Sequence, residues 1–361
     1  MNETTLQFKS FDQLSSGSRI AWRIAQVVVW LVGAAILFCL LFFPTLGVTL
    51  FWNILIPVAP LLLVLATGLW RNVCPLASTN LLPRHLGLSK RKKLSAAQQG
   101  KLNLTGVIAL FAIVPLRHAL LNRSGMATAV MIISAAVIAT GLGLIYEWKS
   151  AWCSGLCPVH PVEKLYGGKV MMSLPNAHCS QCVNCSVPCP DSTPHINPKS
   201  SSKTIYHRLS GLLIIGGLPG FIWGWFHVAD VYHAQSFYEF VSVYKMPLLG
   251  CLLSMTLYLI LSKMTGPGFD RNLTNIFAAA GVSCYYWYRI PALLGFGLFG
   301  HDGMLVDLGN ILPAWSISVI TMAMAAFLFF WLVVRKETQV RWALRPPYGQ
   351  KDGDQIGNLT A

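Results

Sequence analysis

The chain has 361 residues, of which 54% are hydrophobic and only 11% are charged, and its formal net charge is +14. A soluble domain carries about 25% charged residues, so this composition excludes one large soluble core. Long uncharged runs remain, and runs of about 18 or more apolar residues are typical of transmembrane helices.

The apolar runs predict eight membrane-spanning helices. Four runs contain no charge, at 24–43, 45–70, 124–146 and 308–334; four others carry one or two ionisable groups, at 102–122, 209–229, 246–262 and 272–299. We therefore expect an all-α polytopic membrane protein with about eight spans. The first run is too long for a cleavable signal peptide, and about twenty polar residues precede it.

The basic residues indicate how these spans are oriented. With eight spans and both termini on one side, that side holds all of the 27 Lys and Arg residues except Arg117, Arg123, Lys245 and Arg289. By the positive-inside rule this side is cytoplasmic. Because the basic residues are spread over five segments beside the membrane, they favour contact with anionic lipid headgroups and disfavour a nucleic-acid partner.

The spans divide the chain into five expected segments: a cytoplasmic N-terminus at 1–23, a four-helix half at 24–148 with a basic loop at 71–101, a cytoplasmic domain at 149–208, a second four-helix half at 209–334, and a basic cytoplasmic tail at 335–361. A domain of fewer than about sixty residues forms a marginal core on its own. We expect a bound metal cluster to stabilise the segment at 149–208.

That segment contains a dense cysteine motif, C-x2-C-x2-C-x3-C-P, formed by Cys179, Cys182, Cys185, Cys189 and the proline that follows. This is the ligand spacing of bacterial ferredoxins. Structural zinc usually takes two cysteine pairs separated by a dozen or more residues, and disulfides are rare in a reducing compartment. The spacing therefore predicts a 4Fe–4S cluster.

Three further cysteines, Cys74, Cys153 and Cys157, lie on the same face in two related pieces. Cys74 and Cys157 both precede proline, and Trp70 stands where Cys153 stands in the second piece, which predicts an internal duplication. In two-cluster ferredoxins the last cysteine of the motif ligates the other cluster. By analogy we expect Cys179, Cys182 and Cys185 to share a first cluster with Cys157, while Cys189 joins Cys74 and Cys153 at a second. The second would be a 3Fe–4S centre or a 4Fe–4S centre with one other ligand. One cluster held by the four-cysteine motif alone is the simpler alternative.

These motifs resemble the membrane-bound polyferredoxin family, which includes the NapH, NosR and CcoG types. The resemblance covers about 24–195 and rests on Cys74-Pro, the run from Cys153 to Pro158, and the run from Cys179 to Pro190. It implies 4Fe–4S clusters and electron transfer linked to quinone or to a periplasmic partner. The chain departs from the family in having Trp70, a single full ferredoxin motif, and more spans than the NapH-type relatives.

A second candidate site lies toward the outer side of the membrane. Ionisable residues inside a membrane are functional candidates by default. The set could bind quinone, b-type haem or a metal; the other interpretation is that its arginines extend to the interface and its histidines only make hydrogen bonds there. Its members are Arg117, His118, His227, His233, Arg289, His301 and Asp302. His118 and His227 lie at similar depth on different helices, as an axial haem pair would require.

We therefore expect a membrane-bound iron–sulfur protein of a bacterial inner membrane that relays electrons between the quinone pool, or a cytoplasmic donor, and a partner redox protein. An assembly or maturation factor for a respiratory metalloenzyme is the alternative. The expected partners are lipids and other subunits of a redox complex, one of them periplasmic or membrane-bound. The sequence contains no Ser-His-Asp set, Walker loop or dinucleotide fingerprint, which disfavours a stand-alone hydrolase or kinase.

Overall fold

The computed structural model describes residues 15–147, 149–171, 174, 204–231, 237–300 and 302–336. The described residues form helices joined by turns, with isolated β-bridges and no strand among them. The ferredoxin motif at 179–190 lies outside the described residues, as do His233 and His301. The expected all-α membrane architecture is therefore confirmed, while the cluster-bearing loop stays a prediction.

Seven helices within the described residues are long and apolar enough to cross a membrane: Ser16–Phe42, Pro44–Leu65, Ala96–Leu121, Gly125–Ile145, Ile205–Phe226, Phe237–Thr265 and Ala314–Val334. The eighth expected span corresponds to α13 (Asp270–Leu293), which is long enough but more polar. Its buried residues include Thr274, Ser283, Tyr286 and Arg289. Because α14 (Ala314–Phe329), α10 (Leu218–Phe226) and α12 (Lys245–Thr265) pack against α13, its polar side chains are shielded from lipid.

The first half of the chain supplies two helical hairpins. α1 (Ser16–Phe42) turns at Phe43 into α2 (Pro44–Val48), which continues through the π-helical η2 (Thr49–Leu55) into α3 (Ile56–Leu65). α6 (Ala96–Leu116) starts at a capping box made by Ser95 and Gln98 and ends in the π-helical η3 (Arg117–Leu121). The Ser124 side chain then caps α7 (Gly125–Ile145). Such caps satisfy N–H groups that a new helix leaves without partners.

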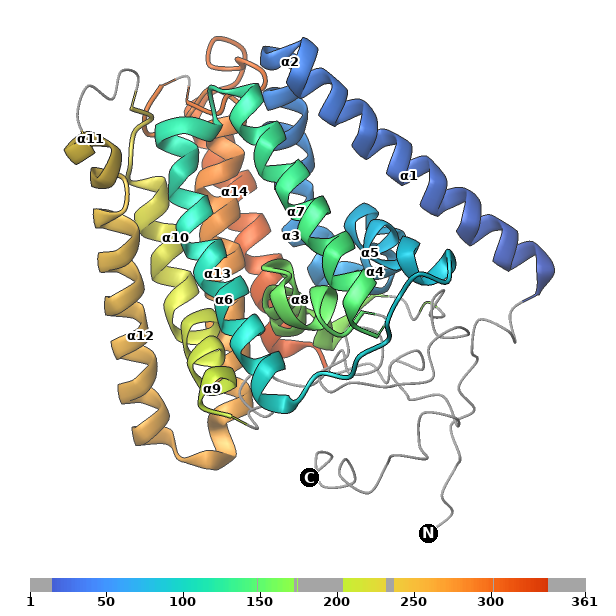
Figure 1. The fold of residues 1–361 in the computed structure, drawn as a ribbon. Helices are drawn as coiled ribbons and strands as arrows, with labels where there is room; N and C mark the ends of the chain where they lie inside the picture. Colours follow the sequence, from blue (N-terminus) through green and yellow to red (C-terminus); the bar gives the residue numbers. More distant parts are fainter. Residues whose placement is uncertain are drawn as a thin grey trace.

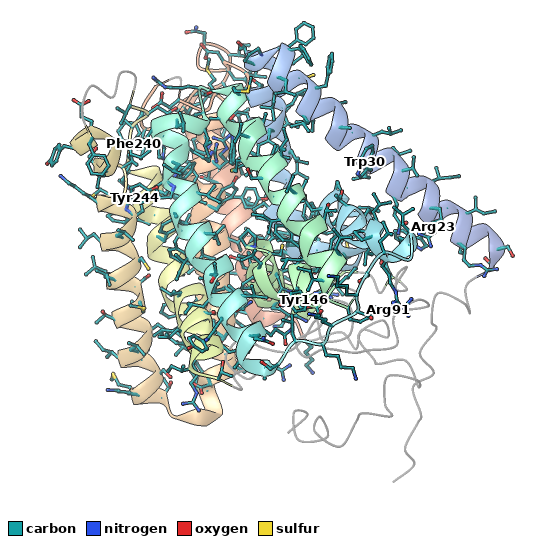
Figure 2. The ribbon with its side chains drawn as sticks, viewed as in Figure 1. Arg23, Trp30, Arg91, Tyr146, Phe240 and Tyr244 are labelled. Atoms are coloured by element: carbon teal, nitrogen blue, oxygen red, sulfur yellow. The ribbon has the colours of Figure 1, made fainter. Side chains whose placement is uncertain are left out.

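Short helices follow each hairpin. α4 (Thr67–Val73) and α5 (Pro75–His85) follow α3; the π-helical η4 (Trp152–Leu156), α8 (Val159–Tyr166) and the 3₁₀ turn η5 (Gly167–Lys169) follow α7. At the end of α7 the chain forms an isolated bridge between Lys92 and Tyr146, in the region that Arg91 and Tyr146 mark in Figure 2. Each of the two hairpins is therefore followed by a set of short helices in the same order along the chain.

The second half completes the bundle with α9 (Ile205–Leu212), the π-helical η7 (Leu213–Gly217), α10 (Leu218–Phe226), α11 (Phe237–Ser242), α12 (Lys245–Thr265), the 3₁₀ turn η8 (Pro267–Phe269), α13, α14 (Ala314–Phe329) and the π-helical η9 (Phe330–Val334). α10 and α12 pack closely because Gly220 and Gly250 face each other's backbone. In a lipid membrane the burial of apolar surface contributes little to helix association, so small residues that allow two backbones to approach closely become important.

Figure 1 shows α1 at one side of the molecule and α12 at the other, with α6, α10, α13 and α14 between them. The fully buried core is shared by both halves of the chain, and includes Val64 on α3, Val107 on α6, Ile214 on η7, Phe221 on α10 and Ala279 on α13. α2 and α11 lie at one end of the bundle and α8 lies toward the other (Figure 1). We call these the α2 end and the α8 end.

Candidate functional site

The Cys74-Pro75 turn links α4 to α5. Cys74 has φ −54° and ψ 120°, so it leaves the helical region just before Pro75 starts α5. The backbone N–H groups of Ala77 and Leu76 point toward its thiol closely enough to lower the pKa of that thiol. These N–H groups belong to the first turn of α5, where no helical carbonyl is available to them.

The Cys157-Pro158 turn has nearly the same geometry. Cys157 has φ −60° and ψ 118°, and the backbone N–H groups of Val159 and His160 in α8 lower the pKa of its thiol. The donors lie two and three residues after the cysteine, as they do in the first turn. The resemblance between the two sequence pieces thus extends to the backbone conformation and to the backbone N–H groups near the thiol.

Burial controls the protonation of these two thiols. It raises the pKa of Cys74, which Lys149 partly offsets, and it raises the pKa of Cys157 to about 12. Cys74 also raises the pKa of Cys157 by its charge, so the two thiols lie in one neighbourhood. Without a metal both groups are thiols at neutral pH, whereas metal ligation requires thiolates. A metal cation together with the helix N-terminal N–H groups would supply the stabilisation that a thiolate needs here.

Cys153 belongs to η4, one turn before Cys157, and is partly exposed. Among the residues that the structure describes, no group of three His, Cys, Asp or Glu side chains is arranged to hold a metal. Cys74, Cys153 and Cys157 therefore do not form a complete centre by themselves. Any cluster that uses them needs ligands from elsewhere, and the sequence supplies candidates in the motif at 179–190.

Both Cys-Pro turns pack against the sides of long helices rather than beyond their ends. Pro75 contacts Gly33 of α1, and the Leu156 carbonyl lies against Gly106 of α6, where any Cβ would collide with it. Gly106 is ten residues into α6, about 15 Å along the axis. The second turn therefore lies beside α6 rather than beyond its end.

Buried charges connect the helices that carry the two turns. Arg71 on α4 and Glu163 on α8 form a buried ion pair, with side chains 3% and 7% exposed. Lys149 and Lys164 are also buried. An anionic cluster with cysteine ligands would interact favourably with such cations, because interactions between charges are strong where water is excluded. The sequence offered no sign of the Arg71–Glu163 pair, whose members are 92 residues apart.

The second candidate site is a cavity of about 190 Å³ at the α2 end. It is formed by the ends of α6, α10 and α13 together with the loop that follows α13. The structure brings together four members of the predicted outer set, Arg117, His118, Arg289 and Asp302, and adds Asp230, which the sequence placed only nearby. His227 lies next to this lining, against the Trp223 and Tyr288 rings.

His118 and Asp230 form the polar centre of this cavity. Nδ1 of His118 lies 2.6 Å from Oδ1 of Asp230, and its Nε2 lies 3.0 Å from the backbone carbonyl of Trp225. A carbonyl only accepts, so Nε2 donates to it. The Asn122 amide donates to both carboxylate oxygens of Asp230, at 3.0 and 3.1 Å, and an Asp302 carboxylate oxygen accepts the Asp230 backbone N–H at 2.9 Å.

These hydrogen bonds occupy both ring nitrogens of His118, so it has none available for haem iron. His227 uses Nδ1 to donate to the Trp223 carbonyl at 2.7 Å, which leaves only its Nε2. The predicted axial pair of His118 and His227 is therefore not supported by the geometry. The two hydrogen-bond partners of His118, Asp230 and Trp225, follow it by more than a hundred residues in the sequence, and no local pattern could have indicated them.

Arg117 is 3% exposed, and its guanidinium lies between two indoles, 4.4 Å from the Trp52 ring centre and 4.8 Å from that of Trp225. Its Nε donates to Asn122 Oδ1 at 3.1 Å, while its buried Nη2 has no hydrogen-bond partner among the described residues. Arg289 is 2% exposed. Both side chains are thus enclosed by protein, and the expectation that they extend to the interface is wrong.

Comparison with models of protein families, with curated proteins and with solved structures finds no match for this chain.

Proposed function

We propose that this chain is a membrane-bound iron–sulfur protein that passes single electrons between the quinone pool, or a cytoplasmic donor, and a partner redox protein. The observation that carries the proposal is the ferredoxin spacing of Cys179, Cys182, Cys185 and Cys189 in a chain whose described residues form membrane-spanning helices. A 4Fe–4S cluster supplies the redox chemistry, and the protein positions it, insulates it and sets its potential.

The two Cys-Pro turns support this proposal independently of the motif. Cys74 and Cys157 each present a partly buried sulfur to two backbone N–H groups. Hydrogen bonds to cluster sulfurs help to set the reduction potential of an iron–sulfur centre and belong to its usual surroundings. In the proposal these turns hold ligands of the same cluster as the motif or of a second one.

Charge distribution supports the proposed orientation. In this orientation the α8 end faces the cytoplasm of a bacterial cell, and the α2 end faces outward. Lys149, Lys164 and Lys169 belong to the α8 end and are buried. The ferredoxin motif then lies in a reducing compartment, where thiolates bind metal rather than forming disulfides.

EPR spectroscopy on anaerobically purified protein, before and after dithionite, tests this function. We expect a reduced 4Fe–4S signal in the native protein, its loss in Cys182→Ser, and its retention in Cys39→Ser, which changes a cysteine inside α1. Cys74→Ser and Cys157→Ser should alter or remove a signal if these turns hold ligands. A full native signal in Cys182→Ser would contradict the assignment.

A further inference from the structure

The α2-end cavity contains a buried arginine donor that the described part of the protein does not satisfy. Arg117 Nη2 is buried without a partner there. Arg289 donates through Nη2 to the Trp52 carbonyl at 2.9 Å and to Asn53 Oδ1 at 2.8 Å. Its Nη1 lies against Gly303, which lines the cavity. The two guanidinium groups therefore present N–H donors to a ligand that can accept hydrogen bonds.

Gly303 makes room for this arrangement. Its φ is +69°, in the left-handed region that favours glycine, and a Cβ there would collide with Nη1 of Arg289. The loop after α13 thus brings its backbone directly against the guanidinium. A side chain at this position would displace the arginine from the cavity wall.

The charge of the described lining indicates what kind of acceptor fits. Arg117 and Arg289 are positive and Asp302 is negative. His118 and Asp230 together are neutral, whichever of them holds the proton between Nδ1 and Oδ1. One positive charge therefore remains, enclosed by protein. A buried charge is normally compensated by an opposite one, because its desolvation is otherwise costly.

We propose that this cavity binds a singly charged oxyanion, with Arg117 and Arg289 donating hydrogen bonds to its oxygens. Planar guanidinium groups suit carboxylate and phosphate oxygens especially well. A metal cation would add positive charge to a positive site, and His118 has no free nitrogen to ligate it. A neutral quinone could accept the hydrogen bonds but would leave the charge uncompensated.

The same oxyanion chemistry is available from two sources. One is the phosphodiester of a phospholipid, since the exposed apolar residues Trp287, Leu298 and Phe299 belong to the cavity lining and could contact acyl chains. The other is a free anion in the outer compartment. The inference goes beyond the electron-transfer proposal and does not depend on any cluster.

The test titrates the full-length protein in a neutral detergent while its thermal midpoint is recorded. Dimethyl phosphate serves as the free phosphodiester, dihexanoylphosphatidylglycerol as the lipid, and decylubiquinone as the quinone. We expect the thermal midpoint to rise and then saturate as at least one phosphodiester probe is added. The Kd obtained from this rise should be at least tenfold weaker in Arg117→Lys and in Arg289→Lys. Lysine keeps the charge but lacks the planar pair of donors.

Lys245→Gln is the matched control, because it removes an exposed cation at the start of α12 outside the cavity lining. We expect its Kd to stay within twofold of the native value. A tenfold preference for the lipid would identify a phospholipid as the source, and equal affinities would identify a free anion. Circular dichroism verifies that each variant is folded, independently of its metal content. If only one of the two arginine variants folds, that variant alone is enough to test the proposal.

No saturable shift with either phosphodiester, or shifts equal in the native protein and in both arginine variants, would overturn the proposal. A saturable shift with decylubiquinone alone, lost in Arg117→Lys, would overturn it too and would assign the cavity to quinone.

Discussion

Replacing Glu163 by Gln should destabilise the protein strongly, because it leaves the buried guanidinium of Arg71 without its carboxylate. The two side chains are 7% and 3% exposed, so water cannot replace the lost partner. Removing one member of a buried ion pair costs about 3–5 kcal/mol. At about 1.4 kcal/mol for each factor of ten, this lowers the folded-to-unfolded ratio by roughly two to four powers of ten.

Glu147→Gln provides the matched control. Glu147 also faces an arginine, Arg84, but the N–O distance is 3.5 Å and Arg84 is 14% exposed, and Oε1 of Glu147 makes no hydrogen bond among the described residues. The Glu147 side chain is only 5% exposed, but the longer N–O distance and the lack of a hydrogen bond to Oε1 make this pair weaker than the Arg71–Glu163 pair. The control therefore removes the same charge from the α8 end at a much smaller expected cost.

The assay is equilibrium unfolding of the detergent-solubilised protein, followed by tryptophan fluorescence, for the single variants and for Arg71→Met with Glu163→Met. Buried pairs are often replaced by apolar residues with little loss, so the double variant should recover much of the stability and give a coupling energy of at least about 2 kcal/mol. If Glu163→Gln costs no more than Glu147→Gln, or if the double variant shows no recovery, the reasoning is refuted.

Local geometry supports three more predictions. Gly220→Leu should force α10 and α12 apart, since a Cβ at Gly220 already collides with the Gly250 backbone; overpacking typically costs about 1–3 kcal/mol, measurable as a lower thermal midpoint, and an unchanged midpoint would contradict the close contact. Asp230→Asn should remove the negative charge beside His118 and one of the two oxygens that accept from the Asn122 amide. It should destabilise the α2 end by about 1–3 kcal/mol, seen as faster amide hydrogen exchange there; unchanged exchange would argue against the pair. In metal-free protein the pKa of the Cys157 thiol is raised from 9.0 to about 12, so the protonated thiol contributes stability below about pH 9 that is lost as the pH rises toward 12. Maleimide labelling of Cys157 should therefore be slow at about pH 8 and should accelerate as the pH rises through this window. Fast labelling at about pH 8 would contradict the prediction.

The membrane architecture was largely predictable from the sequence because the apolar runs are long and charge-free. The run at 272–299 predicted α13 as a span, but the sequence could not show that its polar residues face other helices rather than lipid. Its place inside the bundle explains how Arg289 can be buried in a helix that the sequence suggested was an ordinary span.

The candidate sites were predictable in part. Cysteine spacing carries metal chemistry in its local sequence, so Cys74 and Cys157 could be singled out from the sequence alone. Their packing against the sides of α1 and α6 could not, because it depends on contacts such as Gly106 with the Leu156 carbonyl. Arg117 and Arg289 stood out as charges inside spans, but their pairing in one cavity depends on helix packing that no local pattern encodes.

Metal and acid-labile sulfide analysis of the full chain, purified without oxygen, tests the central claim most directly. The account predicts about four iron and four sulfide per chain for one cluster, or about seven to eight iron and eight sulfide for two. A colourless protein that contains zinc, or that contains neither iron nor sulfide, would contradict it.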